Sequence, residues 1–163
     1  MEITNMSLPQ AEVNDLFDFV RLDLPAAYRY LNVISACVDA IFEHIDHLHE
    51  KEILVYQVKL AVHETCTNII DHAYGLRDQP AESRRQEDRI EAVLSLVKEP
   101  TSLVIDLYDS GVSFNLTDVQ TPNQEEVQER GYGLFLVREL MSDIKYEASP
   151  KKNHWRLVKT LNS

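Results

Sequence analysis

Residues 51–73 constrain the fold of this chain more than any other stretch, because they have the pattern of one long amphipathic helix. At about 100° per residue, a set of apolar side chains falls on one side of that helix: Leu54, Val58, Val62, Ile69 and Ala73. A helix of this kind must bury its apolar side against a second layer of structure. Gly75 follows Tyr74 and suits a left-handed C-terminal cap, so we predict that the helix ends there.

A second stripe, of polar residues, runs along the edge of the apolar side of the same helix. Glu64, Asn68 and Asp71 have the spacing i, i+4, i+7, which places them on one side of an α-helix. A carboxylate and a carboxamide one turn apart, at the rim of a core, can reach into a cleft together. Spacing alone favours a solvated polar face, so a functional interpretation of the stripe depends on other parts of the chain.

The rest of the chain has the periodicities of a sheet and two further helices. Alternating apolar residues predict strands at residues 17–24, 88–98, 102–108, 143–148 and 155–161. Residues 25–47 have helical spacing, with Pro25 suited to the first turn, and a short helix is expected to start near Gly133. We therefore predict an α+β fold, a two-layer α/β sandwich with a mostly antiparallel sheet and helices on one face.

Composition limits the classes of function. The 163 residues suit a single domain spanning residues 1–163, with residues 1–11 expected to form a flexible leader. A net charge of −11 argues against a general nucleic-acid-binding surface, which needs clustered Lys and Arg. No stretch approaches the ~20 apolar residues of a membrane span, and the N-terminus lacks the features of a signal peptide. We expect a cytoplasmic protein with no membrane partner and no direct nucleic-acid partner.

Two glycine-containing motifs follow the long helix. Asp109-Ser-Gly111 comes directly after a predicted strand, and Gly131-Tyr-Gly133 precedes the last predicted helix. An aspartate after a buried strand can accept a hydrogen bond from the exocyclic amine of a purine, although a turn-starting role is its plain alternative. Glycines before a helix N-terminus let phosphates approach backbone N–H groups. The polar loop between the motifs, residues 116–130, is long enough to be functional or disordered.

Three motifs therefore occur in a fixed order: Glu64-x3-Asn68-x3-His72, Asp109-x-Gly111 and Gly131-x-Gly133. Together they resemble the N, G1 and G2 boxes of the GHKL (Bergerat-type) ATPases. The longer strings around the first and third motifs look most like the anti-sigma-factor serine/threonine protein kinase branch. The resemblance covers about residues 24–161, and three boxes in order are much more specific than any one alone. It implies the Bergerat ATP-binding fold, with ATP and Mg²⁺ as cofactors.

The resemblance implies distinct roles for two residues of the long helix. Asn68 would supply an oxygen to Mg²⁺, which takes only one or two protein ligands besides phosphates and waters. Glu64 would be the catalytic base that accepts the proton of a substrate hydroxyl. These two residues lie about 6 Å apart along the helix axis, so both can face one nucleotide.

The resemblance assigns the glycine motifs to the nucleotide. Asp109 and Gly111 would bind the adenine, and Gly131 and Gly133 would bind the phosphates. Arg130 comes directly before the second motif, where a lid arginine of the resembled kinases contacts the terminal phosphate.

Two departures from the usual boxes leave the glycines and the aspartate intact. The G1 box often continues Gly-x-Pro-Phe-Asp, whereas this chain has Gly111-Val-Ser-Phe-Asn115. The G2 box often has an arginine between its glycines, whereas this chain has Tyr132. The sequence therefore leaves open whether catalysis is retained.

The resemblance implies an ATP-dependent serine/threonine protein kinase that phosphorylates a STAS-type anti-anti-sigma protein and sequesters a sigma factor or similar regulator. The resembled family also makes a homodimer a reasonable expectation. One alternative is a non-catalytic partner-switching module that keeps the ATPase fold. A second is a detached histidine-kinase ATPase domain, which the missing H-box disfavours. The sequence does not identify the protein partners.

Overall fold

The structure is a computed structural model that describes residues 16–77, 79–80, 83, 85–98, 100–114 and 132–161. Its elements in chain order are strand β1 (Leu16–Pro25), 3₁₀ helix η1 (Tyr28–Tyr30), helices α1 (Leu31–Glu43) and α2 (Lys51–Asn68), π-helix η2 (Ile69–Ala73), strands β2 (Arg89–Val97) and β3 (Ser102–Asp109), helix α3 (Tyr132–Leu140), and strands β4 (Asp143–Glu147) and β5 (Asn153–Thr160).

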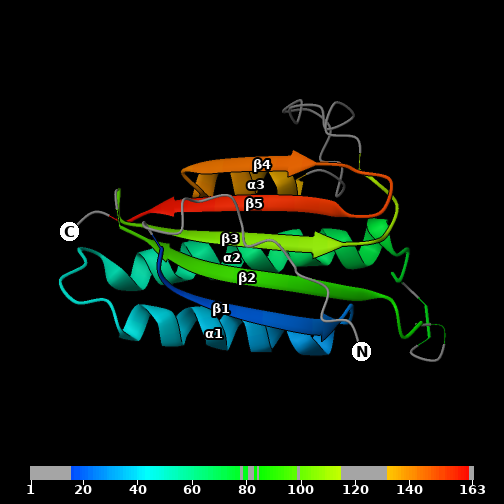
Figure 1. The fold of residues 1–163 in the computed structure, drawn as a ribbon, viewed down its shortest axis with the longest axis horizontal. Helices are drawn as coiled ribbons and strands as arrows, with labels where there is room; N and C mark the ends of the chain where they lie inside the picture. Colours follow the sequence, from blue (N-terminus) through cyan, green and yellow to red (C-terminus); the bar gives the residue numbers. More distant parts are fainter. Residues whose placement is uncertain are drawn as a thin grey trace.

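The strands form one five-stranded sheet in the order β1-β2-β3-β5-β4, and every neighbouring pair is antiparallel. All three α-helices lie on one face of this sheet (Figure 1). Antiparallel hairpins can leave one sheet face uncovered, because alternate side chains point to opposite faces. The predicted two-layer α+β sandwich is therefore confirmed.

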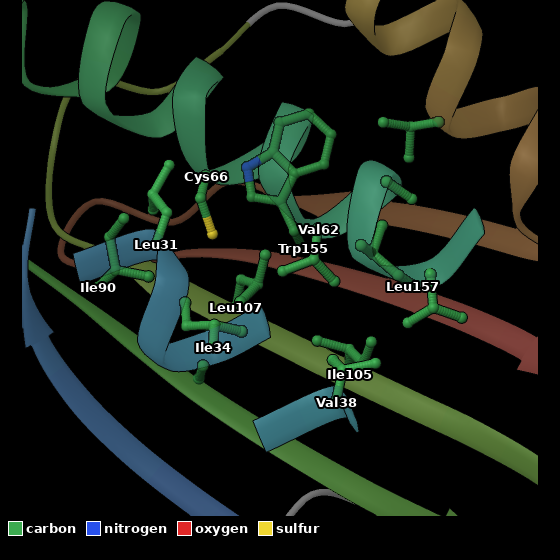
Figure 2. Close-up of a cluster of buried hydrophobic side chains, with 14 of the residues drawn as sticks. Leu31, Ile34, Val38, Val62, Cys66, Ile90, Ile105, Leu107, Trp155 and Leu157 are labelled. Atoms are coloured by element: carbon green, nitrogen blue, oxygen red, sulfur yellow. The ribbon is translucent and has the colours of Figure 1, made fainter. Parts of the chain in front are cut away.

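The core lies between the helices and the sheet, where Figure 2 shows side chains of both layers meeting. In β3, Ile105 and Leu107 are 0% exposed and face the helices. From the other layer, α1 contributes Val38 and α2 contributes Val62 and Cys66. Fully burying one large apolar side chain contributes about 1.5–3 kcal/mol, so this seam fixes the position of α2 over the central strands.

The helix predicted for residues 25–47 begins later and ends earlier than expected. Pro25 is the last residue of β1, where it pairs with Arg89 of β2, and it does not begin a helix. Proline suits a first helical turn and an edge strand equally well, because both positions tolerate a missing N–H. Helix α1 ends at Glu43, and His47 has a φ of 59°, which is outside the right-handed helical region.

The helix predicted for residues 51–73 is confirmed, but its last turn is wider than an α-helix. Helix α2 continues into η2, where the Tyr74 N–H donates to the Ile69 carbonyl at 3.1 Å. Gly75 then adopts a φ of 64°, the left-handed conformation that favours glycine. Turns of this kind occur often at functional sites, and this one directly follows Asn68.

A carboxylate is buried on the sheet face opposite the helices. Asp106 is 0% exposed, and it accepts hydrogen bonds from the Arg156 Nε at 2.8 Å and Nη2 at 3.1 Å. The His154 Nε2 lies 2.6 Å from the same carboxylate. Burial alone would raise the pKa of Asp106, but the contacts with His154 and Arg156 outweigh burial and hold that pKa below its ordinary value.

We predict that Asp106→Asn lowers the free energy of unfolding by about 2 kcal/mol at neutral pH, because the Arg156 guanidinium loses its charged partner. A carboxyl group whose pKa is depressed by folding stabilises the fold above its unfolded-state pKa of about 4, and loses that contribution as the pH falls through the folded-state value. Urea denaturation between pH 7 and acid pH should therefore show a shallower acid-side loss in the variant.

Asp143→Asn is the matched control. Its partner Lys145 lies 3.8 Å away, and both side chains are more than half exposed. Exposed pairs of this kind contribute roughly 0–1 kcal/mol. Equal losses of stability in the two variants would contradict a special role for the Asp106 cluster.

Candidate functional site

Residues of the first and third motifs come together where α2 meets α3. Glu64 and Asn68 lie near the end of α2, and Gly133 lies in the first turn of α3. A Cβ added to Gly133 would lie 2.7 Å from the Glu64 Oε2 and 3.9 Å from the Asn68 Nδ2. The absence of a side chain at this glycine is what allows the Glu64 carboxylate to lie against the first turn of α3.

The end of β3 is held against the end of η2 by a close backbone contact. A Cβ added to Gly111 would lie only 2.4 Å from the Ala73 carbonyl oxygen. The next residue, Val112, donates its N–H to the same oxygen at 2.7 Å. Only glycine fits at this position without moving the backbone.

The hydroxyl group of Tyr74 reinforces this junction. It donates to the Arg89 carbonyl at 2.6 Å and accepts the Ser110 N–H at 3.0 Å. One side chain therefore connects the end of η2 with the beginning of β2 and the end of β3. Ser110, which lies between Asp109 and Gly111, is consequently fixed relative to the long helix.

Asp109 is a buried carboxylate at the end of β3, with 4% of its surface exposed. Its Oδ1 accepts the Gly111 N–H at 2.9 Å and the Asn153 Nδ2 at 2.8 Å. Burial raises the pKa of Asp109 above its ordinary value, and the bonds from Asn153 and Gly111 partly oppose this shift. Both donors from the described residues reach Oδ1, so Oδ2 is the oxygen left to accept a hydrogen bond from a ligand.

A narrow pocket joins this carboxylate to the end of α2. Asn68 and Asp109 line it together with the aromatic side chains of Phe114, Tyr146 and Trp155. The Tyr146 and Trp155 ring centroids lie 4.5 Å apart, and the Phe114 centroid lies 5.8 Å from that of Trp155. Figure 2 shows Trp155 on its strand beside Cys66 of α2. The cavity between these rings has a volume of only about 10 Å³. A purine base could lie against the flat apolar walls and the fixed acceptor only after the aromatic side chains move apart.

Phe114 was not predicted as a site residue, and neither were three residues from another part of the chain: Tyr146, Asn153 and Trp155. These three residues lie on the last hairpin, β4 and β5, and reach the site because β5 pairs with β3. The alternation of residues in that hairpin indicated strands and nothing about a site. Strand pairing is non-local, so no spacing within the hairpin could have predicted it.

Other predicted residues are not part of the described site. Arg130 and Gly131 lie outside the residues that the structure describes. Asp71, expected on the same stripe as Glu64 and Asn68, accepts a hydrogen bond from the Tyr28 hydroxyl and does not line the pocket. The π-helical turn after Asn68 gives the following residues a wider spacing than the α-helical spacing from which the stripe was predicted.

The described residues fit a magnesium site that relies on phosphates for most of its ligands. Within the described ranges, no group of three or more His, Cys, Asp or Glu side chains could hold a metal ion. Mg²⁺ takes few protein ligands when it is bound together with phosphates, and the Asn68 amide oxygen can supply one. No helix within the described ranges has the length and apolar character that a membrane span requires.

We predict that Gly111→Ala lowers the free energy of unfolding by about 2 kcal/mol, because the added methyl group meets a backbone carbonyl that cannot move easily. Gly75→Ala is the control: open space surrounds that position, and only its left-handed φ of 64° opposes the substitution, at a cost of about 1 kcal/mol. Urea denaturation of both variants checks this. A Gly111→Ala protein as stable as the wild type would contradict the close contact.

Comparisons with known proteins identify the family of this chain. Residues 24–159 match a family model described as the histidine kinase-like ATPase domain. The chain is 28% identical over 145 residues to the serine-protein kinase RsbW of Bacillus pumilus, covering 84% of this chain and 83% of the relative. It is 24% identical over 143 residues to RsbW of Bacillus velezensis, covering 81% and 79% of the two chains.

A solved structure has the same fold. The RsbU and RsbW domains of Rv1364c from Mycobacterium tuberculosis match with a TM-score of 0.60 at 12% identity, over 89% of this chain. This chain spans only 33% of that longer polypeptide. Because the family model covers residues 24–159, which include the long helix, strands β2, β3 and β4 and all three motifs, the chain belongs to the histidine kinase-like ATPase (GHKL) family, with distant homology to the RsbW serine-protein kinases.

Proposed function

We propose that this chain is a single-domain, ATP-dependent serine/threonine protein kinase. The observation that carries the proposal is the contact between Glu64 and the first turn of α3. Asn68, one helical turn after Glu64, lies beside this contact and also lines the pocket that contains Asp109. A base, a metal ligand and an adenine acceptor then face one nucleotide. The 28% identity to a serine-protein kinase supports the same reaction class.

The adenine end of the nucleotide would enter between Phe114, Tyr146 and Trp155 once these side chains move apart, because the cavity between them is only about 10 Å³. Its exocyclic amine would donate to the Asp109 Oδ2, while the Gly111 N–H donates to Oδ1 and helps to hold the carboxylate in place. An ionised carboxylate accepts hydrogen bonds and does not donate them, so this arrangement favours a 6-amino purine over a 6-oxo purine.

The phosphate end would lie between α2 and the N-terminus of α3. Backbone N–H groups at a helix N-terminus bind anions well, and Gly133 lies in the first turn of this helix. We propose that Gly131 and Arg130 extend this cradle to the terminal phosphate. Mg²⁺, held by the Asn68 oxygen, would neutralise charge on the phosphates.

Glu64 would act on the protein substrate. Its carboxylate would accept the proton of a serine or threonine hydroxyl as the hydroxyl oxygen attacks the γ-phosphorus, and ADP would leave with the bond to the β-phosphate oxygen broken. Proton, phosphoryl group and leaving group are thereby accounted for. The Glu64 side chain is only partly buried, so a substrate hydroxyl can reach it.

We further propose a STAS-type anti-anti-sigma protein as the substrate and a sigma factor or similar regulator as the sequestered partner, with the kinase acting as a homodimer. The motif resemblance and the similarity to RsbW kinases support this class of partner. A non-catalytic partner-switching module is the second candidate, because Tyr132 replaces the usual arginine of the third motif and is 60% exposed.

The first test is isothermal titration with ATP, with and without Mg²⁺. We expect saturable, Mg²⁺-dependent binding by the wild type. Asp109→Asn should weaken ATP binding about tenfold, the value of one hydrogen bond to a charged group, and Asn68→Ala should remove the Mg²⁺ dependence. An absence of binding at millimolar ATP would contradict the nucleotide site and favour the non-catalytic module.

We predict that Glu64→Gln slows phosphoryl transfer to a serine-bearing STAS protein by 10²–10⁴-fold, the usual contribution of a general base. ATP affinity should change little, because the glutamine keeps the size of the side chain and Glu64 does not line the adenine pocket. Single-turnover transfer from radiolabelled ATP measures the rate. Wild-type turnover in this variant would refute the role of Glu64.

We also predict that Gly133→Ala lowers phosphoryl transfer about tenfold or more without lowering stability. The added methyl group meets the flexible end of Glu64 and displaces the carboxylate by a small distance, and such displacements are costly in catalysis. Alanine is also a better helix former than glycine by up to about 1 kcal/mol. Thermal melting and the transfer assay separate the two effects, and an unchanged transfer rate would contradict the contact.

A further inference from the structure

We infer that Asn153 is a positioning residue that holds the Asp109 carboxylate in the orientation that recognises the 6-amino group of adenine, and that Ser113 orients Asn153 for this task. The inference rests on the proposed nucleotide site. It adds two residues that neither the motifs nor the family comparison assigns.

Asn153 is built into the sheet directly beside Asp109. The two residues are paired in the β3–β5 register, and Asn153 is 1% exposed. Its Nδ2 donates to the Asp109 Oδ1 at 2.8 Å and to the Gly111 carbonyl at 3.1 Å. A buried amide with both N–H groups engaged has a fixed position, so it can fix the carboxylate it contacts.

Ser113 determines which end of the Asn153 amide faces the carboxylate. Its hydroxyl donates to the Asn153 Oδ1 at 2.9 Å, which leaves Nδ2 for Asp109 and Gly111. Serine stands here at the position where related G1 boxes often have proline, which has no hydroxyl group. The departure in this motif therefore supplies the hydrogen bond that orients the amide.

The consequence for a ligand follows from the geometry of the carboxylate. Two donors occupy Oδ1, so rotation of the Asp109 side chain would break two hydrogen bonds and leave both donors unsatisfied in a buried site. Oδ2 is thereby kept as an acceptor for the base. Without the Nδ2 group, only the Gly111 N–H would oppose rotation, and the acceptor would lose its fixed direction.

The test measures discrimination between ATP and inosine triphosphate, which carries a 6-oxo group in place of the amine. Titration of the full chain with each nucleotide should show a wild-type preference for ATP. Asn153→Leu keeps a similar volume and removes Nδ2. We expect it to weaken ATP binding about tenfold and to change inosine triphosphate binding by less than about twofold, because that nucleotide gains nothing from Oδ2.

Ser113→Ala is the matched control. It removes the hydrogen bond to the Asn153 Oδ1 but keeps the Nδ2 contact with Asp109, so the preference for ATP should fall by only about two- to threefold, a value typical of one partly exposed neutral hydrogen bond. Thermal melting of each variant reports on folding. If Asn153→Leu melts too low for titration, Asn153→Ala tests the same bond, since it also lacks Nδ2.

The outcomes separate this inference from the proposed function. An unchanged ratio of ATP to inosine triphosphate affinity in the Asn153 variant, or an equal loss for both nucleotides, would overturn the positioning role while leaving Asp109 as the acceptor. A wild type that binds both nucleotides equally would overturn the adenine assignment of Asp109 itself, and the inference with it.

Discussion

The close contact between Gly111 and the Ala73 carbonyl fixes the Asp109 end of the site relative to the long helix. It joins the end of a central strand to the end of the long helix, two elements that the core already holds in place. Because Gly111 has no side chain, its backbone packs directly against the Ala73 carbonyl. The helix and the strand cannot shift relative to each other at this contact without disturbing the close packing. The position of Asp109 relative to Asn68 is consequently a property of the core, and the site needs no loop of its own to bring them together.

How well the sequence predicted each element depended on the range of the interactions that form it. The long helix and the hairpin of β2 and β3 follow from periodicity, a local property, and the prediction was right for both. Pro25 was placed wrongly in a helix because its restricted φ suits both a first helical turn and an edge strand. The π-helical turn at Ile69–Ala73 was not predicted, because such a turn leaves no periodic signal in a single sequence.

The site divides in the same way. Local motifs predicted five residues of the site that the structure describes: Glu64, Asn68, Asp109, Gly111 and Gly133. Gly133 at the start of α3, and Asp109 and Gly111 at the end of β3, lie against the long helix that carries Glu64 and Asn68. Their proposed roles remain predictions. Asn153 and Trp155 were not predicted because their contacts arise from the pairing of β5 with β3. These strands are far apart in the sequence, so no local periodicity predicts which residues of the two strands lie side by side. A buried asparagine is conspicuous only after its burial is known.

The two carboxylates of the site occupy environments that suit different work. Asp109 is 4% exposed, and amide donors occupy one of its oxygens, so it is fixed as a directional acceptor. Glu64 lies against the first turn of α3, where the flexible end of its side chain occupies the space left by Gly133. A carboxylate that recognises a base by a hydrogen bond must keep a fixed orientation, whereas a carboxylate that accepts a proton must be able to reach the substrate hydroxyl. Under the proposed function, burial and hydrogen bonding fix the orientation of Asp109. The glycine beside Glu64 leaves that second carboxylate room to move.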